Sequence, residues 1–206
     1  KTFVFEPEVY SGKKNQIVIE GDAVTPHKHA EVSFDKKTKG YQLASATWHF
    51  STERLPTEAK GDFLKVVRRY FRRSKVGSEI TLHPITPATS VAVGDEVEVH
   101  LLITSKHALE YVQLRDPRAA GFEPASSRSG HKWDLGISWY QEVRDSSTNF
   151  FFEHLPHGQY TFKYRLRATT QGVFKTGPAV IQPVYAPEFV GYSSGRTMSI
   201  SAQTTR

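Results

Sequence analysis

The chain has 206 residues, of which 38% are apolar and 23% are charged, and it contains 13 Phe, 9 Tyr and 3 Trp. This composition predicts a folded globular protein and excludes an intrinsically disordered one. The chain has no cysteine, which excludes disulfides, thiol nucleophiles and cysteine metal ligands.

The first 60 residues contain strand signals but few large apolar side chains. A segment of this length is too short to form a sufficient core alone, so we expect it to be part of a domain whose remainder lies elsewhere. The polar passage Ser51–Asp62 separates it from the strands that follow, which places a domain boundary after residue 60. Strands are predicted here at Gln16–Glu20, Ala30–Phe34 and Ala46–Phe50.

The net charge of +6 is compatible with a nucleic-acid or membrane partner, so the positions of the cations matter. One tight cluster consists of Lys65, Arg68, Arg69, Arg72, Arg73 and Lys75. Apolar and aromatic residues interleave with these cations as in a β-strand. This pattern favours a solvated strand face, or an edge protected against pairing, over a basic binding site. We therefore expect no nucleic-acid partner.

Apolar and polar residues alternate in many segments from here to the end of the chain. The clearest are Val97–Ile103 and Tyr160–Leu166, each of which predicts a strand with one buried and one solvated face. No window shows a capped helical stripe. The pattern predicts an all-β chain: an antiparallel β-sandwich of immunoglobulin-like architecture, preceded by part of a second β-domain. Further strands are predicted at Val66–Arg72, Glu79–Leu82, Tyr111–Leu114, Ile137–Val143, Asn149–Glu153 and Val180–Tyr185.

The stretch Glu110–Thr148 is rich in charged residues between its predicted strands. Because arginine pairs bidentately with carboxylates, these charges predict a buried or half-buried ionic network that pins the long connection. A catalytic acid–base pair, Asp116 with Glu123 or Glu142 with Asp145, is the alternative. Carboxylates beside arginines in loops are usually structural, so we expect no enzyme. The predicted network consists of Arg115, Asp116, Arg118, Glu123, Arg144 and Asp145.

Histidines occur in two close pairs, His27 with His29 and His154 with His157. A metal site needs three or four converging ligands, and neither pair has a further cluster of ligands beside it in the sequence. We interpret these histidines as exposed turn residues and expect neither a metal nor a cofactor.

Aromatic residues are dense between Trp133 and Phe152. Most are expected in the core of the sandwich, but the three consecutive residues Phe150–Phe152 cannot all face inward from a regular strand. At least one of them should therefore contact a neighbouring domain or a covering loop, and such surplus apolar surface favours an interface. A carbohydrate platform that also uses Trp133, Trp139 and Tyr140 is the alternative, because aromatic faces stack on sugars.

An ordered series of short phrases runs through the second part of the chain. The phrases are Val93–Val97, Leu109–Asp116, Arg118–Pro124, Tyr140–Asp145, Thr148–Phe152, Leu155–Tyr160 and Tyr185–Phe189. In this order they resemble the C-terminal macroglobulin-like domain of bacterial alpha-2-macroglobulins, over Lys65–Ile200. Upstream, Tyr41–Phe50 resembles the return segment of the CUB-like domain, which in this family is interrupted by the helical thioester domain.

The resemblance implies the trailing part of a CUB-like domain in residues 1–60 and the C-terminal macroglobulin-like domain in residues 61–206. Members of the family are envelope-associated protease traps, in which cleavage of a bait region triggers a rearrangement. Neither a bait region nor a Cys-x-x-Gln thioester element occurs in this sequence. The resemblance therefore implies a non-catalytic module of an endopeptidase inhibitor, periplasmic or associated with the cell envelope, that reaches target proteases only through the whole protein.

The resemblance also implies intramolecular partners, namely the thioester-type helical domain and other macroglobulin domains of the parent chain. In relatives the terminal domain shields the thioester from water with aromatic side chains. From its position in a Tyr-x-Pro-x-aromatic phrase, Tyr185 is expected in that role, with Phe189 and Tyr140 at the same domain interface. The alternative function is a carbohydrate- or adhesin-type binding module that shares the sandwich. No run of the sequence approaches the ~18 apolar residues of a spanning helix, so no direct membrane insertion is expected.

Overall fold

The computed structural model describes residues 17–29, 31–37, 39–40, 46, 54–86, 89, 91–134 and 136–202. The chain separates into two units, residues 1–48 and 49–206. Lys60 forms a β-bridge with Tyr192 and lies in the second unit. The domain division after residue 60 stays a prediction. Assignment of the first residues to a CUB-like domain stays a prediction. The strand expected at Ala46–Phe50 lies, except for Ala46, outside the described residues.

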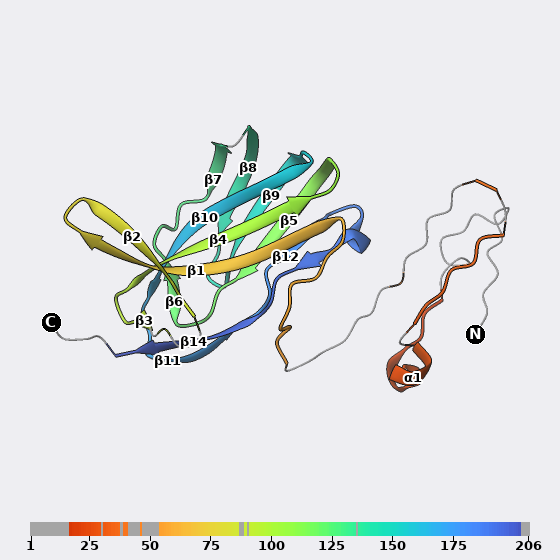
Figure 1. Cartoon of the computed structure of the whole chain (residues 1–206), viewed down its shortest axis with the longest axis horizontal. Helices are drawn as coiled ribbons and strands as arrows, with labels where there is room; N and C mark the ends of the chain where they lie inside the picture. The colour runs from red at the N-terminus through yellow and green to blue at the C-terminus, as the bar shows by residue number, and fades with distance from the viewer. Residues whose placement is uncertain are drawn as a thin grey trace. The chain divides into compact units, whose positions relative to one another are not determined.

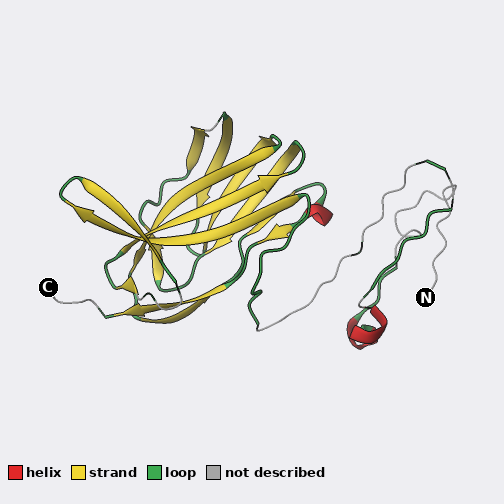
Figure 2. Ribbon diagram, viewed as in Figure 1, coloured by secondary structure: helices red, strands yellow, loops and turns green. Residues whose placement is uncertain are grey.

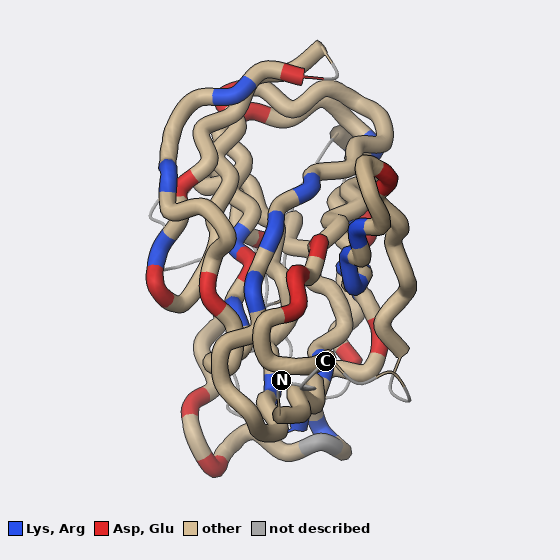
Figure 3. Tube along the Cα trace, turned by 90° about the vertical axis from the view of Figure 1, so that its left-hand side faces the viewer, with Lys and Arg blue, Asp and Glu red and all other residues tan. Residues whose placement is uncertain are grey.

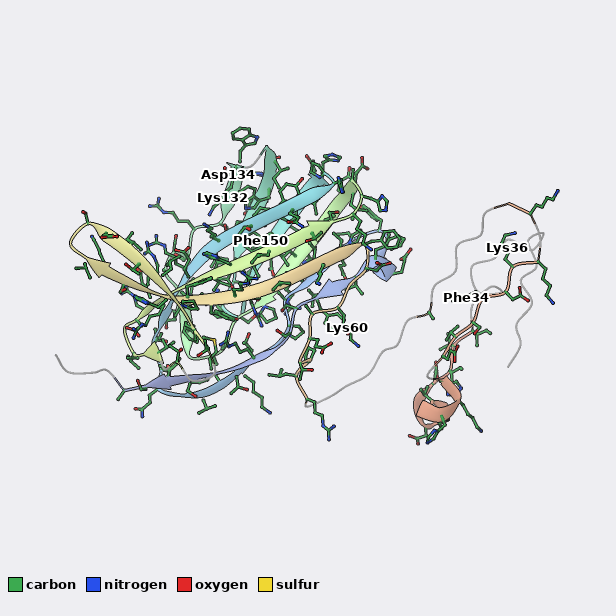
Figure 4. All side chains as sticks on the ribbon, viewed as in Figure 1. Phe34, Lys36, Lys60, Lys132, Asp134 and Phe150 are labelled. Atoms are coloured by element: carbon green, nitrogen blue, oxygen red, sulfur yellow. The ribbon has the colours of Figure 1, made fainter. Side chains whose placement is uncertain are left out.

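In the first unit, the described residues form two short helical turns and no strand. These are the 3-10 turn η1 (Gly21–Ala23) and the four-residue helix α1 (Pro26–His29) (Figure 1). The strands predicted at Gln16–Glu20 and Ala30–Phe34 are therefore wrong over their described residues. Phe34, labelled in Figure 4, is 62% exposed. An isolated extended segment without a paired neighbour cannot satisfy its backbone groups within a sheet.

In the second unit, the strands form two large sheets and one small sheet (Figures 1 and 2). The five-stranded sheet has the order β2–β1–β4–β10–β6: β2 (Glu79–Pro84), β1 (Leu64–Val76), β4 (Glu96–Ser105), β10 (Gly158–Ala168) and β6 (Phe122–Pro124). The six-stranded sheet has the order β13–β12–β5–β9–β8–β7: β13 (Gly191–Tyr192), β12 (Val180–Pro183), β5 (Leu109–Pro117), β9 (Ser147–Leu155), β8 (Ile137–Val143) and β7 (Gly130–Asp134). The small sheet contains β11 (Gly172–Thr176), β14 (Arg196–Ser201) and β3 (Val91–Ala92), of which β14 and β3 pair in parallel.

The two large sheets bury their inner faces against each other. Buried and half-buried residues alternate along the whole of β4, and buried and exposed residues alternate along β10 from Phe162 onward. Phe162 meets Trp139 of β8 at 5.0 Å and Phe152 of β9 at 5.1 Å between ring centroids, so rings from both sheets interlock. Phe150 of β9, labelled in Figure 4, packs against Phe162 of β10 with ring centroids 5.8 Å apart. The predicted all-β antiparallel sandwich is confirmed.

Two glycines allow the segment before β1 to cross β13 closely. A Cβ added at Gly61 or at Gly191 would overlap the carbonyl oxygen of Leu64. Gly61 also has a φ of 149°, which residues with a side chain rarely adopt. This crossing brings Lys60 to Tyr192, where each backbone amide donates to the other residue's carbonyl over 2.8 and 2.7 Å.

Candidate functional site

The outer surface of the six-stranded sheet carries a cluster of apolar and aromatic side chains, which we call the aromatic face. It comprises Tyr111 of β5, Tyr140 of β8, Phe151 of β9, and Val184 and Tyr185 after β12. Strand alternation explains part of it: Phe150 and Phe152 are buried, which leaves Phe151 half-buried on the outer surface. Tyr140 is the cross-strand partner of Phe151. Contiguous surface of this kind is typical of a contact site.

Tyr111 reaches this face through a break in strand alternation. Leu109 packs against the core and Val112 is buried, so two inward-facing positions are three residues apart instead of two or four. Between them Tyr111 has a φ of 52°, the one positive φ of a non-glycine residue in the described part of the chain. This left-handed conformation is costly for a bulky residue and persists only where its surroundings impose it. Here the amide of Val184 donates to the Tyr111 carbonyl over 2.8 Å.

Tyr185 is 81% exposed and stands at the margin of the face. Its ring meets that of Tyr111 edge to face, with centroids 5.5 Å apart. A groove of about 260 Å³ lies beside Tyr111. Its lining consists of the other members of the aromatic face apart from Tyr185, the apolar residues Val112, Trp139 and Phe152, and the polar residues His131, Ser138 and Glu153. A mostly apolar groove with a few polar groups suits an apolar side chain from a partner.

The three residues predicted at a domain interface fall in two places. Tyr140 and Tyr185 belong to the aromatic face. Phe189, in the 3-10 turn η2 (Pro187–Phe189), instead packs edge to face against Phe63 with ring centroids 4.9 Å apart. The shielding role of all three stays a prediction.

A buried ion pair joins the two large sheets. The side chains of Arg68 in β1 and Asp116 in β5 are 1% and 0% exposed. One carboxylate oxygen of Asp116 accepts from Arg68, and the other accepts from the Tyr164 hydroxyl over 2.7 Å. Arg68 also donates to the carbonyl of Gly177 over 2.6 Å. Both charges are thus paired and hydrogen-bonded, which is the condition for keeping them in a core.

The buried ion pair and its setting alter the pKa of neighbouring groups. Burial raises the pKa of Tyr70 to about 12, with Arg68 opposing the shift and Asp116 adding to it. Burial also raises the pKa of Tyr164 well above its ordinary value, and the negative charge of Asp116 raises it further. Burial, the largest single influence, would lower the pKa of Arg68, but the charge and hydrogen bond of Asp116, together with Tyr70 and Tyr164, outweigh it and the pKa is raised. Both tyrosines are therefore neutral, and Arg68 charged, at neutral pH.

Sequence analysis placed Arg68 in a solvated cluster or on a protected edge, and the structure corrects this. Along β1, Arg68 is in phase with Val66 and Tyr70 and faces the core, whereas Arg69 is exposed. Burial is tolerated because Asp116 supplies the opposite charge. The strand is an inner one only from Phe71 to Arg73, where it pairs with both β2 and β4; over Leu64–Tyr70 its paired strand is β4.

The six charges predicted to pin the long connection do not form one network in the described structure. Arg118 donates to the backbone carbonyls of Arg144 and Asp145 over 3.0 and 2.8 Å, so it holds the β8–β9 turn without using a carboxylate. The carbonyls of a tight turn have no neighbouring strand to supply a hydrogen bond. They therefore compete with carboxylates for the guanidinium of Arg118. The other charges lie apart: Arg115 and Glu123 are exposed on different sheets, Asp116 is buried with Arg68, and Arg144 pairs with Glu142.

The described residues form no metal centre, because no three His, Asp or Glu side chains converge among them. His27, His154 and His157 are exposed, and the His29 Nδ1 lies 2.9 Å from the amide nitrogen of Thr25. Within the same residues, no helix is both long enough and apolar enough to cross a bilayer.

Two antiparallel sheets packed face to face, one of them carrying an exposed aromatic cluster, define a β-sandwich module. Residues 64–188 match the family described as the bacterial alpha-2-macroglobulin MG10 domain, and the chain belongs to this family. The resemblance that the ordered phrases indicated is therefore confirmed.

The chain spans only a small part of the length of two curated relatives that it matches. The chain is 27% identical over 172 residues to circularly permutated Ras protein 2 of Dictyostelium discoideum, covering 84% of this chain and 4% of that protein. It is 23% identical over 120 residues to an alpha-2-macroglobulin homolog of Nostoc sp., covering 53% of this chain and 6% of that protein. The match thus spans about a twentieth of each relative's length.

Solved structures share the fold at low sequence identity. Salmonella alpha-2-macroglobulin reacted with methylamine is 16% identical, with a TM-score of 0.55 over 71% of this chain and 10% of that one. Native alpha-2-macroglobulin from Escherichia coli, spanning domain MG7 to the C-terminus, is 15% identical, with a TM-score of 0.54 over 69% of this chain and 24% of that one. At such identities the likeness concerns the fold alone.

Proposed function

We propose that this chain is a non-catalytic C-terminal module of a bacterial alpha-2-macroglobulin-like protease inhibitor. Its partners are the thioester-type helical domain and other macroglobulin domains of the parent chain, which acts in the periplasm or at the cell envelope. Family membership supports this proposal, as does the small share of each relative that the chain spans. The module packs against the thioester-type domain through its aromatic face and shields that domain from water.

The observation that carries the proposal is the 81% exposure of Tyr185. Its ring contacts Tyr111 at one edge and gains little burial within this chain. A tyrosine brings a large apolar surface and a hydroxyl to an interface, and it loses little side-chain entropy there. Exposed aromatic side chains grouped around a groove are therefore better explained by a neighbouring domain than by the stability of this one.

The described carboxylates support a non-catalytic role. Of the acid–base candidates, Asp116 has both oxygens engaged in the core, by Arg68 and Tyr164. A general acid or base must come within hydrogen-bond reach of its substrate, which a fully enclosed carboxylate cannot do. Glu142, of the other candidate pair, is bound by Arg144.

Packing is tested by hydrogen exchange on the 206-residue chain and on the parent protein. If a neighbouring domain covers the aromatic face, amides of β8, β9 and the segment Pro183–Phe189 exchange more slowly in the parent. Amides of β11, on the small sheet, serve as the internal reference. Equal hydrogen-exchange rates of these amides in the 206-residue chain and in the parent protein would contradict packing.

Shielding is tested separately by Tyr185→Ala in the parent protein. The variant should be inactivated by methylamine faster than the wild type, because water and small amines gain access to the thioester. Val173→Ala is the matched control, since Val173 is 71% exposed but lies on β11. An unchanged rate of inactivation by methylamine would refute shielding, and so would a parent protein without a Cys-x-x-Gln element. Neither result bears on packing, which the hydrogen-exchange experiment tests.

A carbohydrate-binding module is the second candidate, because the same face offers aromatic rings to a sugar. Ring geometry disfavours it, since Tyr111 and Tyr185 are inclined at 83° and His131 and Tyr140 at 64°, which does not make a flat platform. A glycan array probed with the chain decides between the two. Specific glycans that are lost in Tyr185→Ala would favour sugar binding, and an empty array would favour domain packing.

A further inference from the structure

A second surface lies on the outer face of the five-stranded sheet, on the opposite side of the sandwich from the aromatic face. Where its three central strands β1, β4 and β10 pair with one another, their outward positions carry six cations and only two carboxylates, Glu96 and Glu98. Figure 3 marks the Lys and Arg positions of the trace in blue and the Asp and Glu positions in red. We call the six cations the cationic face. They are Lys65, Arg69 and Arg73 of β1, and Lys163, Arg165 and Arg167 of β10.

The two glutamates are already bound by cations of this face. Glu96 accepts from Arg73 over 2.6 Å and lies 3.6 and 3.8 Å from Arg165 and Arg167. Partial burial alone would raise the pKa of Glu96, but the hydrogen bond from Arg73 and the three guanidinium charges lower it. Glu98 lies 3.3 Å from Arg73 as well. The net charge that the cationic face can offer a partner is therefore positive.

That excess charge is concentrated along β10. Lys163, Arg165 and Arg167 occupy alternate positions and point outward, so they repeat at about 6.6–6.8 Å. Arg165 and Arg167 contact Glu96 only loosely, and their side chains are 50% and 59% exposed. Lys163 stands opposite His100 and has no carboxylate partner among the described residues.

We propose that the cationic face binds an acidic polypeptide segment in an extended conformation, with carboxylates on alternate residues meeting the β10 row. An extended chain repeats every second residue at the same spacing as this row, so three carboxylates contact three cations at once. Planar guanidinium groups suit carboxylates in particular. The face already shows this chemistry, because three arginines converge on the carboxylate of Glu96.

Nucleic acid and membrane surfaces match the face less well. Proteins that bind single strands add exposed aromatic rings to the cations. The one aromatic residue at the outward positions of these three strands, Phe71, is half-buried and packs on His100 with ring centroids 4.5 Å apart. Binding to a membrane interface calls for apolar side chains that protrude, whereas the outward-facing Val67 and Leu102 are half-buried between neighbouring strands.

Fluorescence anisotropy with the 206-residue chain tests the proposal. The probe is a short labelled peptide of alternating Glu and Thr, compared with a peptide of the same composition in which all Glu form one block. Reversing the β10 row should weaken binding of the alternating peptide by about 30- to 100-fold, and reversing three cations elsewhere should weaken it less than about threefold. The row variant is K163E/R165E/R167E, and its control with the same net charge is R128E/K132E/K175E.

Each outcome of this experiment either supports the proposal or overturns it. Equal losses in the two variants, or equal affinity for alternating and block peptides, would overturn the proposal by showing attraction to net charge alone. A further outcome is that the chain binds a thymidine oligonucleotide or phosphatidylglycerol vesicles more tightly than the alternating peptide, with the same loss in the row variant. That result would overturn the proposal and identify nucleic acid or a membrane as the partner. K163Q/R165Q/R167Q removes charge without adding repulsion, so a folded Gln variant that keeps full affinity would also overturn it. The surface belongs to another sheet than the aromatic face, so either proposal can fail alone.

Discussion

Asp116→Asn removes the negative charge from the buried ion pair and keeps the shape of the side chain. Arg68 is 1% exposed, and a guanidinium keeps its proton in proteins, so Arg68 stays charged in the core with its counter-ion gone. Breaking a buried pair in this way costs about 3–5 kcal/mol, against a total stability of about 5–15 kcal/mol for a typical domain. The expected loss is therefore about a fifth or more of the free energy of unfolding.

Urea unfolding measures this loss, with Trp139 in the core as the fluorescent reporter. The midpoint should fall while the dependence of the unfolding free energy on urea stays unchanged, which indicates a loss of stability without a change in compactness. Lys106→Ala is the control, because it removes an exposed ion pair with Asp62 and should cost about 0–1 kcal/mol.

A compensated variant separates the unpaired charge from the loss of packing. R68M/D116L/Y164F removes both charges and the hydroxyl together, so no ion is left alone in the core. The carbonyl of Gly177 then loses a donor, which costs about 1–3 kcal/mol. This variant should still be more stable than Asp116→Asn. The reasoning is refuted if Asp116→Asn costs less than about 1 kcal/mol, or if the compensated variant is the less stable of the two.

Three further predictions follow from other contacts. Between pH 10.0 and about 12 the unfolded chain loses the Tyr70 proton and the folded chain keeps it, so Tyr70 should lower the free energy of unfolding by about 2–3 kcal/mol over this window and not below it. Tyr164, whose pKa is raised as well, adds to this fall; urea midpoints against pH measure the slope, which Tyr70→Phe should reduce. Gly191→Ala should cost about 1–3 kcal/mol in urea unfolding because its Cβ overlaps Leu64, while Gly130→Ala, with nothing near, should change stability by less than about 0.5 kcal/mol. Arg118→Ala should cost about 1–2 kcal/mol and speed hydrogen exchange in the β8–β9 turn, and unchanged exchange there would count against its role.

The long strands were predictable because each buries one face against a facing sheet. Val97–Ile103 and Tyr160–Leu166 show strict alternation and lie within β4 and β10. Six strands of the described structure were missed. Three of them, β3, β6 and β13, have only two or three residues and carry no period of their own, and the others, β7, β11 and β14, have five or six residues. The pairing of such short strands depends on residues that are distant in the sequence. Phe122 of β6, for example, pairs with Ala168 of β10.

The buried ion pair left a signal that sequence analysis did not use. Arg68 lies two residues after Val66 and two before Tyr70, and Asp116 lies two after Leu114. Each charge is thus in phase with the apolar positions of its strand, which predicts that it faces the core. Opposite charges at inward positions of two strands indicate a pair across the sandwich, but which strands face each other depends on the topology.

The geometry of the aromatic face could not be predicted, because it depends on how β12 is held at its two ends. Arg68 binds the Gly177 carbonyl just before β12, and the amide of Val184 binds Tyr111 just after it. Nothing in a tyrosine favours the left-handed backbone of Tyr111, so only that second bond and its surroundings explain it. Tyr185 follows directly, so its ring position depends on the same two bonds. The ion pair that stabilises the core therefore also fixes the strand that presents Tyr185, and Asp116→Asn should loosen both.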